Sequence, residues 1–269
     1  MRTSGLYRAV AGSSFRRYAT YRVATAAGVF TNTIFGFFMS YTFIALWDQR
    51  PDLGGYDQAQ ALTFAWVGQG LLAATAVIGG GFREELQERI RTGEVSIDLY
   101  RPVDLQMWWL SADLGRAIFH LLGRGVVPLA VGALVFELAL PTDPLRWLLF
   151  GCAVLLALLV SFAINFLVAL VAFWLLDGNG LNMVSNLLGM FCSGMVMPLT
   201  VFPEQLGTFL QWLPWAALLQ VPADVLLGRY SGAGAFAVLL FPLVWAVVLL
   251  LLGRAVQAAA TRRVVVQGG

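Results

Sequence analysis

Long apolar runs dominate this sequence, and one internal segment, residues 83–104, interrupts them with dense charge. This charged segment reads REELQERIRTGEVSIDLYRPVD and holds ten charged residues in 22, although the whole chain of 269 residues contains only 17 basic and 15 acidic ones. Burying an unpaired charge is very costly. A chain that gathers its charge in one loop is therefore expected to present that loop to water or to a soluble partner.

Several of the apolar runs are longer than the roughly 20 residues that a helix needs to cross about 30 Å of hydrocarbon. Apolar residues make up 59% of the chain, and the ten-residue alternating segments typical of membrane barrels do not occur. The sequence therefore predicts an all-α polytopic membrane protein with one transmembrane domain over residues 1–269. Its six predicted transmembrane helices are residues 23 or 27 to 47, 59–82, 114–140, 147–176, 181–200 and 236–252.

Residues 1–22 predict an amphipathic interfacial helix, an arm on the cytoplasmic membrane surface. They carry five arginines and no acid, interleaved with apolar and aromatic residues, as interfacial helices do. A signal peptide would place its apolar region earlier and add a small-residue cleavage site. A disordered basic tail is the alternative for the first few residues.

Residues 203–234 do not resemble a membrane-crossing helix. Pro203, Pro214 and Pro222 divide them into pieces too short to cross, because proline interrupts a helix. The first piece carries an apolar stripe at helical spacing. We expect two short helices here, external or re-entrant, between the fifth and sixth spans.

The charged segment itself begins with good helix signals. Leu86 and Ile90 stack at i,i+4 spacing, and Glu85 faces Arg89 in the favourable acid-before-base order. Gly93 is a natural residue to follow a helix end, and the alternating apolar residues of 95–99 predict a short extended run. The segment is thus expected to be an amphipathic helix on the membrane surface followed by a tight return. An ordinary solvated loop is the alternative.

The distribution of arginine predicts the orientation in the plasma membrane. With both termini in the cytoplasm, five arginines of the arm and four of the charged segment lie inside, together with Arg254, Arg262 and Arg263. Only Arg50, Arg146 and Arg229 lie outside. Because cytoplasmic loops carry an excess of basic residues, this orientation is favoured, and it places the charged segment in the cytoplasm.

Several function classes are excluded by residue counts. The chain contains no lysine, so it has no P-loop, whose lysine contacts nucleotide phosphates. Cys152 and Cys192 lack partners at metal-ligand spacing, and the single histidine, His120, argues against histidine metal sites and a Ser-His-Asp triad. A net charge of only +2 gives no support for nucleic-acid binding. We expect no catalytic residues, metal or cofactor in this chain.

Polar side chains inside the predicted spans are candidates for a substrate path. An intramembrane arginine costs from about 2.5 kcal/mol upward and usually faces a cavity or a partner, although it can also extend to the headgroups. Neutral amides more commonly form hydrogen bonds between helices. The candidates are Asn32, Arg124, Asn165, Asn182 and Asn186.

Three local motifs carry a resemblance to a known family. They are residues 90–94 and 99–103 (IRTGE and LYRPV), the Ser193-Gly194, Pro198-Leu199, Phe202-Pro203, Leu213-Pro214 and Pro222 series, and the terminal stretch from Arg262-Arg263 to 266–269. With the arm, the spans and the charged helix in this order, the whole chain resembles the ABC-2-type transporter permeases, in the branch described as ABC-2 family transporter proteins.

This resemblance implies a transmembrane permease subunit that pairs with a second, identical or related permease and docks separate ATPase subunits, which bind ATP and Mg²⁺. Such permeases export drugs, antibiotics, lipids or glycans. The charged segment would be the coupling helix that contacts the ATPase, and its implied coupling residues are Arg83, Glu84, Glu85, Glu88, Arg89, Arg91, Glu94 and Arg101.

A secondary, ion-coupled transporter is the alternative function. Such a protein would favour an acidic residue inside a span, whereas Glu137 and Asp177 lie at predicted span ends. Both functions make membrane lipid a partner and neither involves nucleic acid.

Overall fold

The structure is a computed structural model that describes residues 3–175 and 178–264, and all the regular elements in these ranges are helices. The helices are α1 (Thr3–Thr20), α2 (Arg22–Gln49), α3 (Gln58–Leu72), α4 (Arg83–Arg91), α5 (Val95–Tyr100), α6 (Leu105–His120), α7 (Val126–Val135), α8 (Pro144–Leu170), α9 (Asn179–Cys192), α10 (Glu204–Trp212), α11 (Gln220–Leu226), α12 (Ala233–Ala237) and α13 (Leu240–Val264). Short helical turns are η1 (Leu53–Gly55), η2 (Leu121–Gly125), η3 (Val171–Phe173), η4 (Leu199–Val201) and η5 (Pro214–Leu218).

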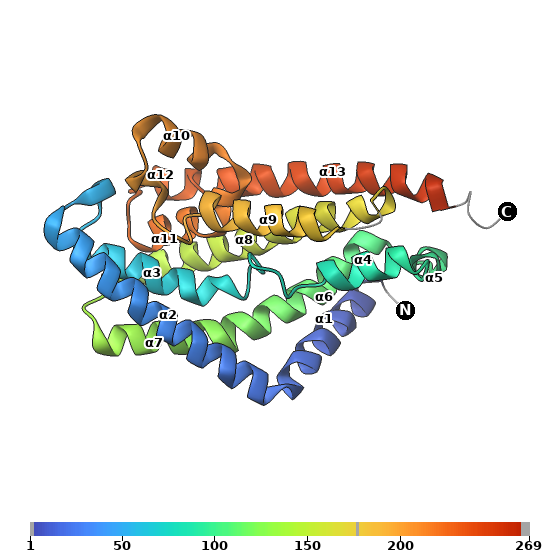
Figure 1. The fold of residues 1–269 in the computed structure, drawn as a ribbon, viewed down its shortest axis with the longest axis horizontal. Coiled ribbons are helices and arrows are strands. Elements are labelled where there is room, and N and C mark those ends of the chain that lie inside the picture. The colour runs from blue at the N-terminus through green and yellow to red at the C-terminus, as the bar shows by residue number, and fades with distance from the viewer. Residues whose placement is uncertain (1–2, 176–177, 265–269) are drawn as a thin grey trace.

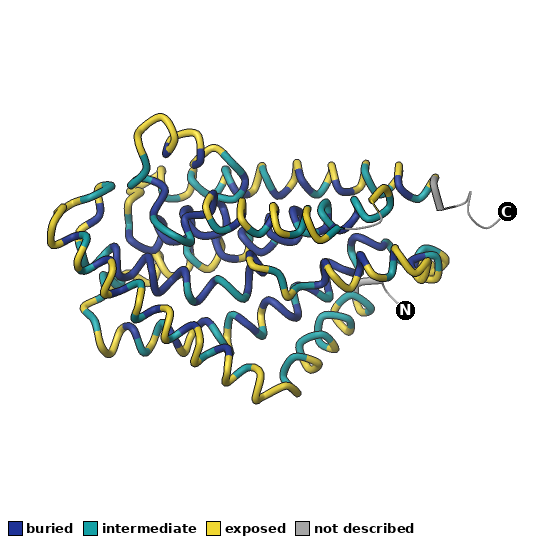
Figure 2. The backbone as a smooth tube through the Cα atoms, in the orientation of Figure 1, coloured by how far each residue is buried: buried dark blue, intermediate teal, exposed yellow. Residues whose placement is uncertain are grey.

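The long helices run broadly along the longest axis of the molecule (Figure 1). α8 lies at the centre, where it contacts α4, α6, α11 and α13. Its most apolar window is 56% buried, whereas the corresponding windows of α2, the α6–α7 helix and α13 are only 17–22% buried. Burial is concentrated along the middle of the bundle (Figure 2). The outer helices thus expose apolar faces that a soluble monomer rarely shows.

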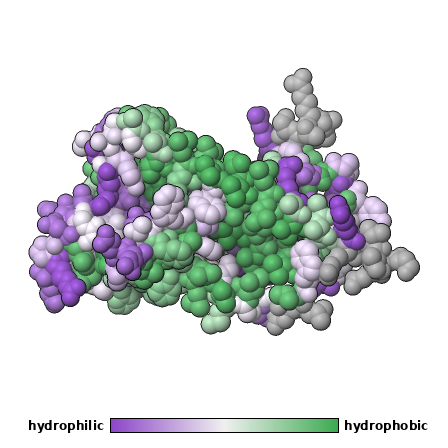
Figure 3. Space-filling model, turned by 90° about the horizontal axis from the view of Figure 1, so that it is seen from above, coloured by the Kyte–Doolittle hydropathy of each residue, from purple (hydrophilic) through white to green (hydrophobic). Residues whose placement is uncertain are grey.

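Hydropathy divides the surface into a hydrophobic middle and two hydrophilic ends (Figure 3). One end, called here the charged end, comprises α4, α5, the start of α1 and the last turns of α13 (Figure 1). The opposite end comprises residues 50–57 with α10, α11 and α12. An apolar band between two polar caps is the surface of a protein embedded in a bilayer.

Four helices are long and apolar enough to cross a membrane: Arg22–Gln49, Leu105–Val135, Pro144–Phe173 and Ala233–Arg262. They contain the apolar parts of predicted spans one, three, four and six. The six-span count is not confirmed, because the helices in the other two places, α3 and α9, have only 15 and 14 residues. Both are shorter than the roughly 20 residues that a spanning helix needs.

The prediction that the second helix continues to residue 82 is wrong, since α3 ends at Leu72. Ala76, Gly79 and Gly80 adopt positive φ, a conformation that ends a right-handed helix. Arg116 of α6 donates hydrogen bonds of 2.8 and 2.9 Å to the carbonyls of Ala73 and Ala74. These bonds satisfy backbone acceptors that the helix end leaves free, and the chain then crosses to α4 as irregular turns.

The prediction that the fifth helix continues to residue 200 is also wrong, since α9 ends at Cys192. Gly194 has a φ of +90°, and Pro198 follows four residues later. The backbone amide of Leu199 instead donates a 2.8 Å hydrogen bond to the Gln220 side chain. Thus a side chain of α11 holds the irregular segment after α9 in place.

Residues 203–234 form short helices in place of a crossing helix, as predicted, but there are more than the two expected: α10, η5, α11 and the start of α12. Leu213 is extended immediately before Pro214, so no continuous helix passes through that proline. α10, η5 and α11 replace the single helix that an uninterrupted apolar sequence would form. They gather at the opposite end, with α12 (Figure 1).

Candidate functional site

The charged end is built around α4, whose sequence satisfies local helix rules. Glu84 and Glu85 lie in its first turn, and Arg89 and Arg91 lie in its last turn, which complements the helix dipole. Leu86 and Ile90 are buried, so the predicted apolar stripe is confirmed. The preceding Phe82 stacks on Phe162 of α8 with ring centroids 4.9 Å apart. α4 is therefore anchored by one apolar face against the bundle.

Residues 95–100 form helix α5, and the predicted extended run is wrong. Val95 and Leu99 are four residues apart, so they share a helix face as readily as they alternate in a strand. Arg89 donates hydrogen bonds of 2.7 and 3.0 Å to Asp98, and this two-pronged contact raises the pKa of the arginine. It replaces the predicted Glu85–Arg89 pair and holds α5 against α4.

The eight implied coupling residues fall into two groups by exposure. Arg83 is buried, with 2% of its surface exposed, and Arg89 is half-buried beside Asp98. The other six lie exposed on α4, α5 and their flanks: Glu84, Glu85, Glu88, Arg91, Glu94 and Arg101. The charged end thus presents a dense surface of mixed charge to its surroundings.

Arg83 points into the bundle, where its guanidinium joins three helices. It donates a 3.2 Å hydrogen bond to Asn165 of α8 and a 2.9 Å bond to Asn186 of α9. Glu84 supplies the negative charge at 2.9 Å. A buried guanidinium needs both a counter-charge and hydrogen-bond acceptors, and this site provides both.

Gln87, one turn further along α4, makes a reciprocal amide pair with Asn182 of α9. The two side chains exchange hydrogen bonds of 3.0 and 2.8 Å. Three of the five substrate-path candidates, Asn165, Asn182 and Asn186, therefore contact the inner face of α4. The structure brings together two residue sets that the sequence analysis had assigned to separate roles.

The remaining two candidates lie elsewhere. Asn32 is buried in α2 and donates a 3.1 Å hydrogen bond to the backbone carbonyl of Gln69 in α3, so it links these two helices. Arg124 lies in the π-helical turn η2, with its guanidinium against Gly28 of α2. In the part of the chain that the structure describes, neither Asn32 nor Arg124 forms a hydrogen bond with the asparagines around Arg83.

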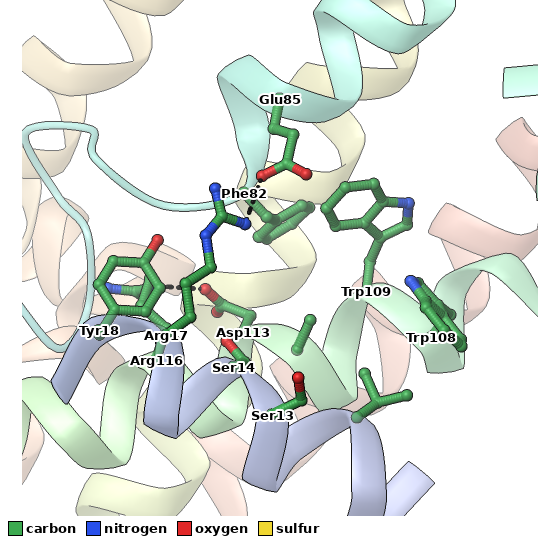
Figure 4. Close-up of a pocket in the computed structure, with 12 residues that line it drawn as sticks. Ser13, Ser14, Arg17, Tyr18, Phe82, Glu85, Trp108, Trp109, Asp113 and Arg116 are labelled. Carbon is green, nitrogen blue, oxygen red and sulfur yellow. Dashed lines mark hydrogen bonds and ion pairs between the residues drawn. The ribbon is translucent and has the colours of Figure 1, made fainter. Parts of the chain in front are cut away.

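The arm, α1, is helical from Thr3 to Thr20 and packs along α6. Its Arg17 forms a 3.2 Å ion pair with Glu85 of α4. A cavity of about 260 Å³ lies between α1, α4 and α6, with aromatic walls that include Trp108 and Trp109 (Figure 4). The arm therefore touches the charged segment directly through a surface ion pair.

A buried ion pair that the sequence patterns did not predict lies at the wall of this cavity. Asp113 and Arg116 of α6 lie 2.6 Å apart and are both nearly fully buried (Figure 4). Asp113 lies inside the candidate span Leu105–Val135, although it falls one residue before the predicted span 114–140. The i,i+3 spacing of Asp113 and Arg116 is the sequence signal for this ion pair.

Asp177 lies outside the described residues, as does most of the terminal motif at 262–269.

A second missed cluster lies at the opposite end. Asp224 of α11 is buried and accepts hydrogen bonds from the Tyr56 hydroxyl and from Gln220. Arg229 lies 3.6 Å from Asp224 and stacks over the Tyr56 ring at 4.1 Å. Burial raises the pKa of both Asp224 and Tyr56. An acid within the apolar run 215–227 was the available signal, because such a residue needs partners.

Within residues 3–175 and 178–264, no group of three or more His, Cys, Asp or Glu residues is arranged to hold a metal ion. The free cysteines, exposed Cys152 and buried Cys192, lie on different helices. The chemistry on offer at the charged end is recognition of a charged surface, with polar bonds leading from it into the bundle.

Comparison with known proteins agrees with this architecture. A search among curated proteins gave no match. A family model described as ABC-2 family transporter protein matches residues 30–268, which include most of α2, helices α4 and α5, the other three candidate spans and the short helices of the opposite end. The chain is therefore a multi-pass membrane protein that belongs to the ABC-2 transporter family, as a permease.

Proposed function

We propose that this permease is the membrane subunit of an ATP-driven exporter, and that the exposed face of α4 and α5 docks a separate ATPase subunit. The observation that carries the proposal is the set of six exposed charged side chains on a helix pair whose other face is anchored in the bundle. Charge-assisted hydrogen bonds at such a surface contribute about 1.5–3 kcal/mol each. ATP and Mg²⁺ would be bound by the partner, because this chain has no P-loop lysine.

The same proposal requires the charged end to face the cytoplasm, with both termini there. α1 begins and α13 ends at that end (Figure 1). The excess of arginine at this end supports the orientation through the positive-inside rule. The largely unburied apolar faces of α2 and α13 offer surfaces for lipid and for a second permease copy.

The inner face of α4 suggests how ATP binding would reach the transport helices. Arg83 and Gln87 bind asparagines of α8 and α9, so a displacement of α4 by the ATPase would act on both helices. The substrate path would then lie beside these helices. Its cargo is expected to be a drug, antibiotic, lipid or glycan.

The docking role is tested by exchanging the charges of Glu88 and Arg91. These exposed residues form an i,i+3 pair at 3.1 Å, so the double variant Glu88→Arg/Arg91→Glu keeps an internal pair while reversing the pattern that a partner meets. The matched control is Glu204→Arg, an exposed acid in the first turn of α10 at the opposite end. The measurement is co-purification with the ATPase and substrate-stimulated ATP hydrolysis.

The exchanged variant should insert and fold like the parent, yet lose ATPase association by roughly tenfold or more, the effect of one charge-assisted contact. Glu204→Arg should bind normally, although it changes the net charge by two units. Normal binding and transport by the exchanged variant would show that the exposed face of α4 is only solvated and docks no ATPase. A secondary transporter would show no ATPase association in any variant.

A further inference from the structure

We propose that Arg124 forms a binding site for the anionic headgroup of a phospholipid, at the junction of α2 and η2. The site goes beyond ATP-driven transport and does not depend on the ATPase docking proposed above. The site consists of an unpaired guanidinium, a glycine against which it lies, and an exposed apolar surface beside it.

Arg124 is a cation without a counter-charge inside a candidate membrane span. It lies in Leu105–Val135, and it makes no hydrogen bond or ion pair with any residue that the structure describes. Its Nε is buried and has no hydrogen-bond partner, whereas neither of its two terminal nitrogens is fully buried. Arginine does not lose its proton in proteins, so the charge persists and an anion at the terminal nitrogens would offset the cost of placing it there.

Gly28 of α2 provides the seat for this guanidinium. A Cβ atom built at position 28 would lie 2.3 Å from Cζ and Nε of Arg124 and 2.5 Å from one terminal nitrogen. The guanidinium therefore lies against the bare α2 backbone. Any side chain at position 28 would displace it, so the seat and the cation form one site.

The local helix geometry aims the arginine at α2. Residues 121–125 form a π-helical turn between α6 and α7. Such a turn inserts an extra residue into a helix, changes the direction of the side chains around it, and occurs frequently at functional sites. A Cβ atom built at Gly123, in the same turn, would lie 3.5 Å from Cγ2 of Thr25, so this turn packs closely against α2.

The surroundings favour a lipid over a water-soluble anion. Val127 lies three residues after Arg124 and therefore on the same side of the helix. It is 44% exposed, and its apolar side chain faces the same bilayer that would supply the ligand. The exposed Arg22 begins α2, two turns before Gly28. A phosphate between these positions would keep its acyl chains along the apolar surface.

The test measures retained lipid on the purified full-length protein. The protein is extracted from bilayers of phosphatidylglycerol and phosphatidylcholine, and bound lipids are counted by native mass spectrometry. The parent is compared with Arg124→Gln, which removes the charge, and with Gly28→Ala, which keeps the arginine but fills its seat. Alanine is a better helix former than glycine, so the second variant should fold even if the first does not. Arg146→Gln, an exposed arginine at the start of α8, is the matched control.

The parent and Arg146→Gln should retain one phosphatidylglycerol that Arg124→Gln and Gly28→Ala bind roughly tenfold more weakly. An excess of inorganic phosphate should not displace it. Equal retention by all four proteins would overturn the site. Displacement by inorganic phosphate, or retention of phosphatidylcholine in place of the anionic lipid, would overturn its assignment to an anionic headgroup.

Discussion

Arg83 shows at the scale of a single residue how the charged end combines two roles. Its guanidinium is buried among Glu84, Asn165 and Asn186, whereas Arg91 on the same helix is exposed. Arg83→Met would leave two half-buried amides and the exposed Glu84 carboxylate without their donor, at a cost of about 0.5–1.5 kcal/mol for each hydrogen bond lost.

We therefore expect Arg83→Met to lower the thermal unfolding midpoint of the protein in detergent, and to lower it more than Arg91→Met does. Arg91→Met should change the free energy of unfolding by no more than about 0.5 kcal/mol, as surface substitutions do. Unfolding midpoints that shift equally in the two variants would contradict the inward-facing network.

Asp224 should make stability depend on pH at the opposite end. Burial raises its pKa in the folded state above the unfolded value of about 3.9. The folded state then binds the Asp224 proton more tightly than the unfolded state does. Protonation of Asp224 therefore stabilises the fold below the unfolded pKa, and this stabilisation is lost as the pH rises through the folded pKa. Asp224→Asn removes this titration.

The unfolding midpoint of the parent, compared with that of Asp224→Asn, should therefore fall as the pH rises from about 4. Glu204→Gln, which alters an exposed acid, should follow the parent. A parent that gains stability over Asp224→Asn with rising pH would contradict the raised pKa, and would show that Arg229 dominates the site.

At the scale of elements, α4 and α9 should behave as one linked pair. Gln87 and Asn182 exchange two hydrogen bonds, so a double-mutant cycle with alanine at both positions should give a coupling energy of about 0.5–3 kcal/mol. Gln87 and Asn32, which lie on α4 and α2 and do not contact each other, should be additive within about 0.5 kcal/mol. Additivity for both pairs would show that the amide pair transmits nothing.

The elements that sequence patterns predicted well are those set by local rules. α1, α4 and the short helices after Pro203 follow from charge placement, apolar spacing and proline. α5 was missed because Val95 and Leu99 fit a strand and a helix equally well. The ends of α3 and α9 were missed because backbone turns at Ala76 and Gly194, held by the distant Arg116 and Gln220, decide them.

The candidate site was predictable only on its outer face. Arg83, Leu86, Gln87 and Ile90 are spaced i, i+3, i+4 and i+7, and all four are buried. An apolar pattern identifies the two hydrophobic members. The two polar members point inward because their hydrogen-bond partners lie in the bundle. These partners are 82 to 103 residues away in sequence, so no local pattern could have predicted the contacts.

At the scale of the whole molecule, the two hydrophilic ends lie on opposite sides of the apolar middle. The apolar middle separates the charged end from residues 50–57 and α10–α12 (Figure 3). Asymmetry of this kind is required of a subunit that receives energy on one side of a bilayer and acts across it. The proposed docking therefore predicts that an ATPase would contact the charged end and not the opposite end.

Site-specific photocrosslinking in native membranes tests that claim most directly. A photoreactive residue replaces Glu88 on α4 or Asp52 at the opposite end, both of which are exposed, and crosslinked partners are identified by peptide mass spectrometry. Position 88 should capture a protein that carries a P-loop sequence, and position 52 should not. Capture of that ATPase from position 52, or none from position 88 in membranes that hydrolyse ATP with the transported substrate, would contradict the account.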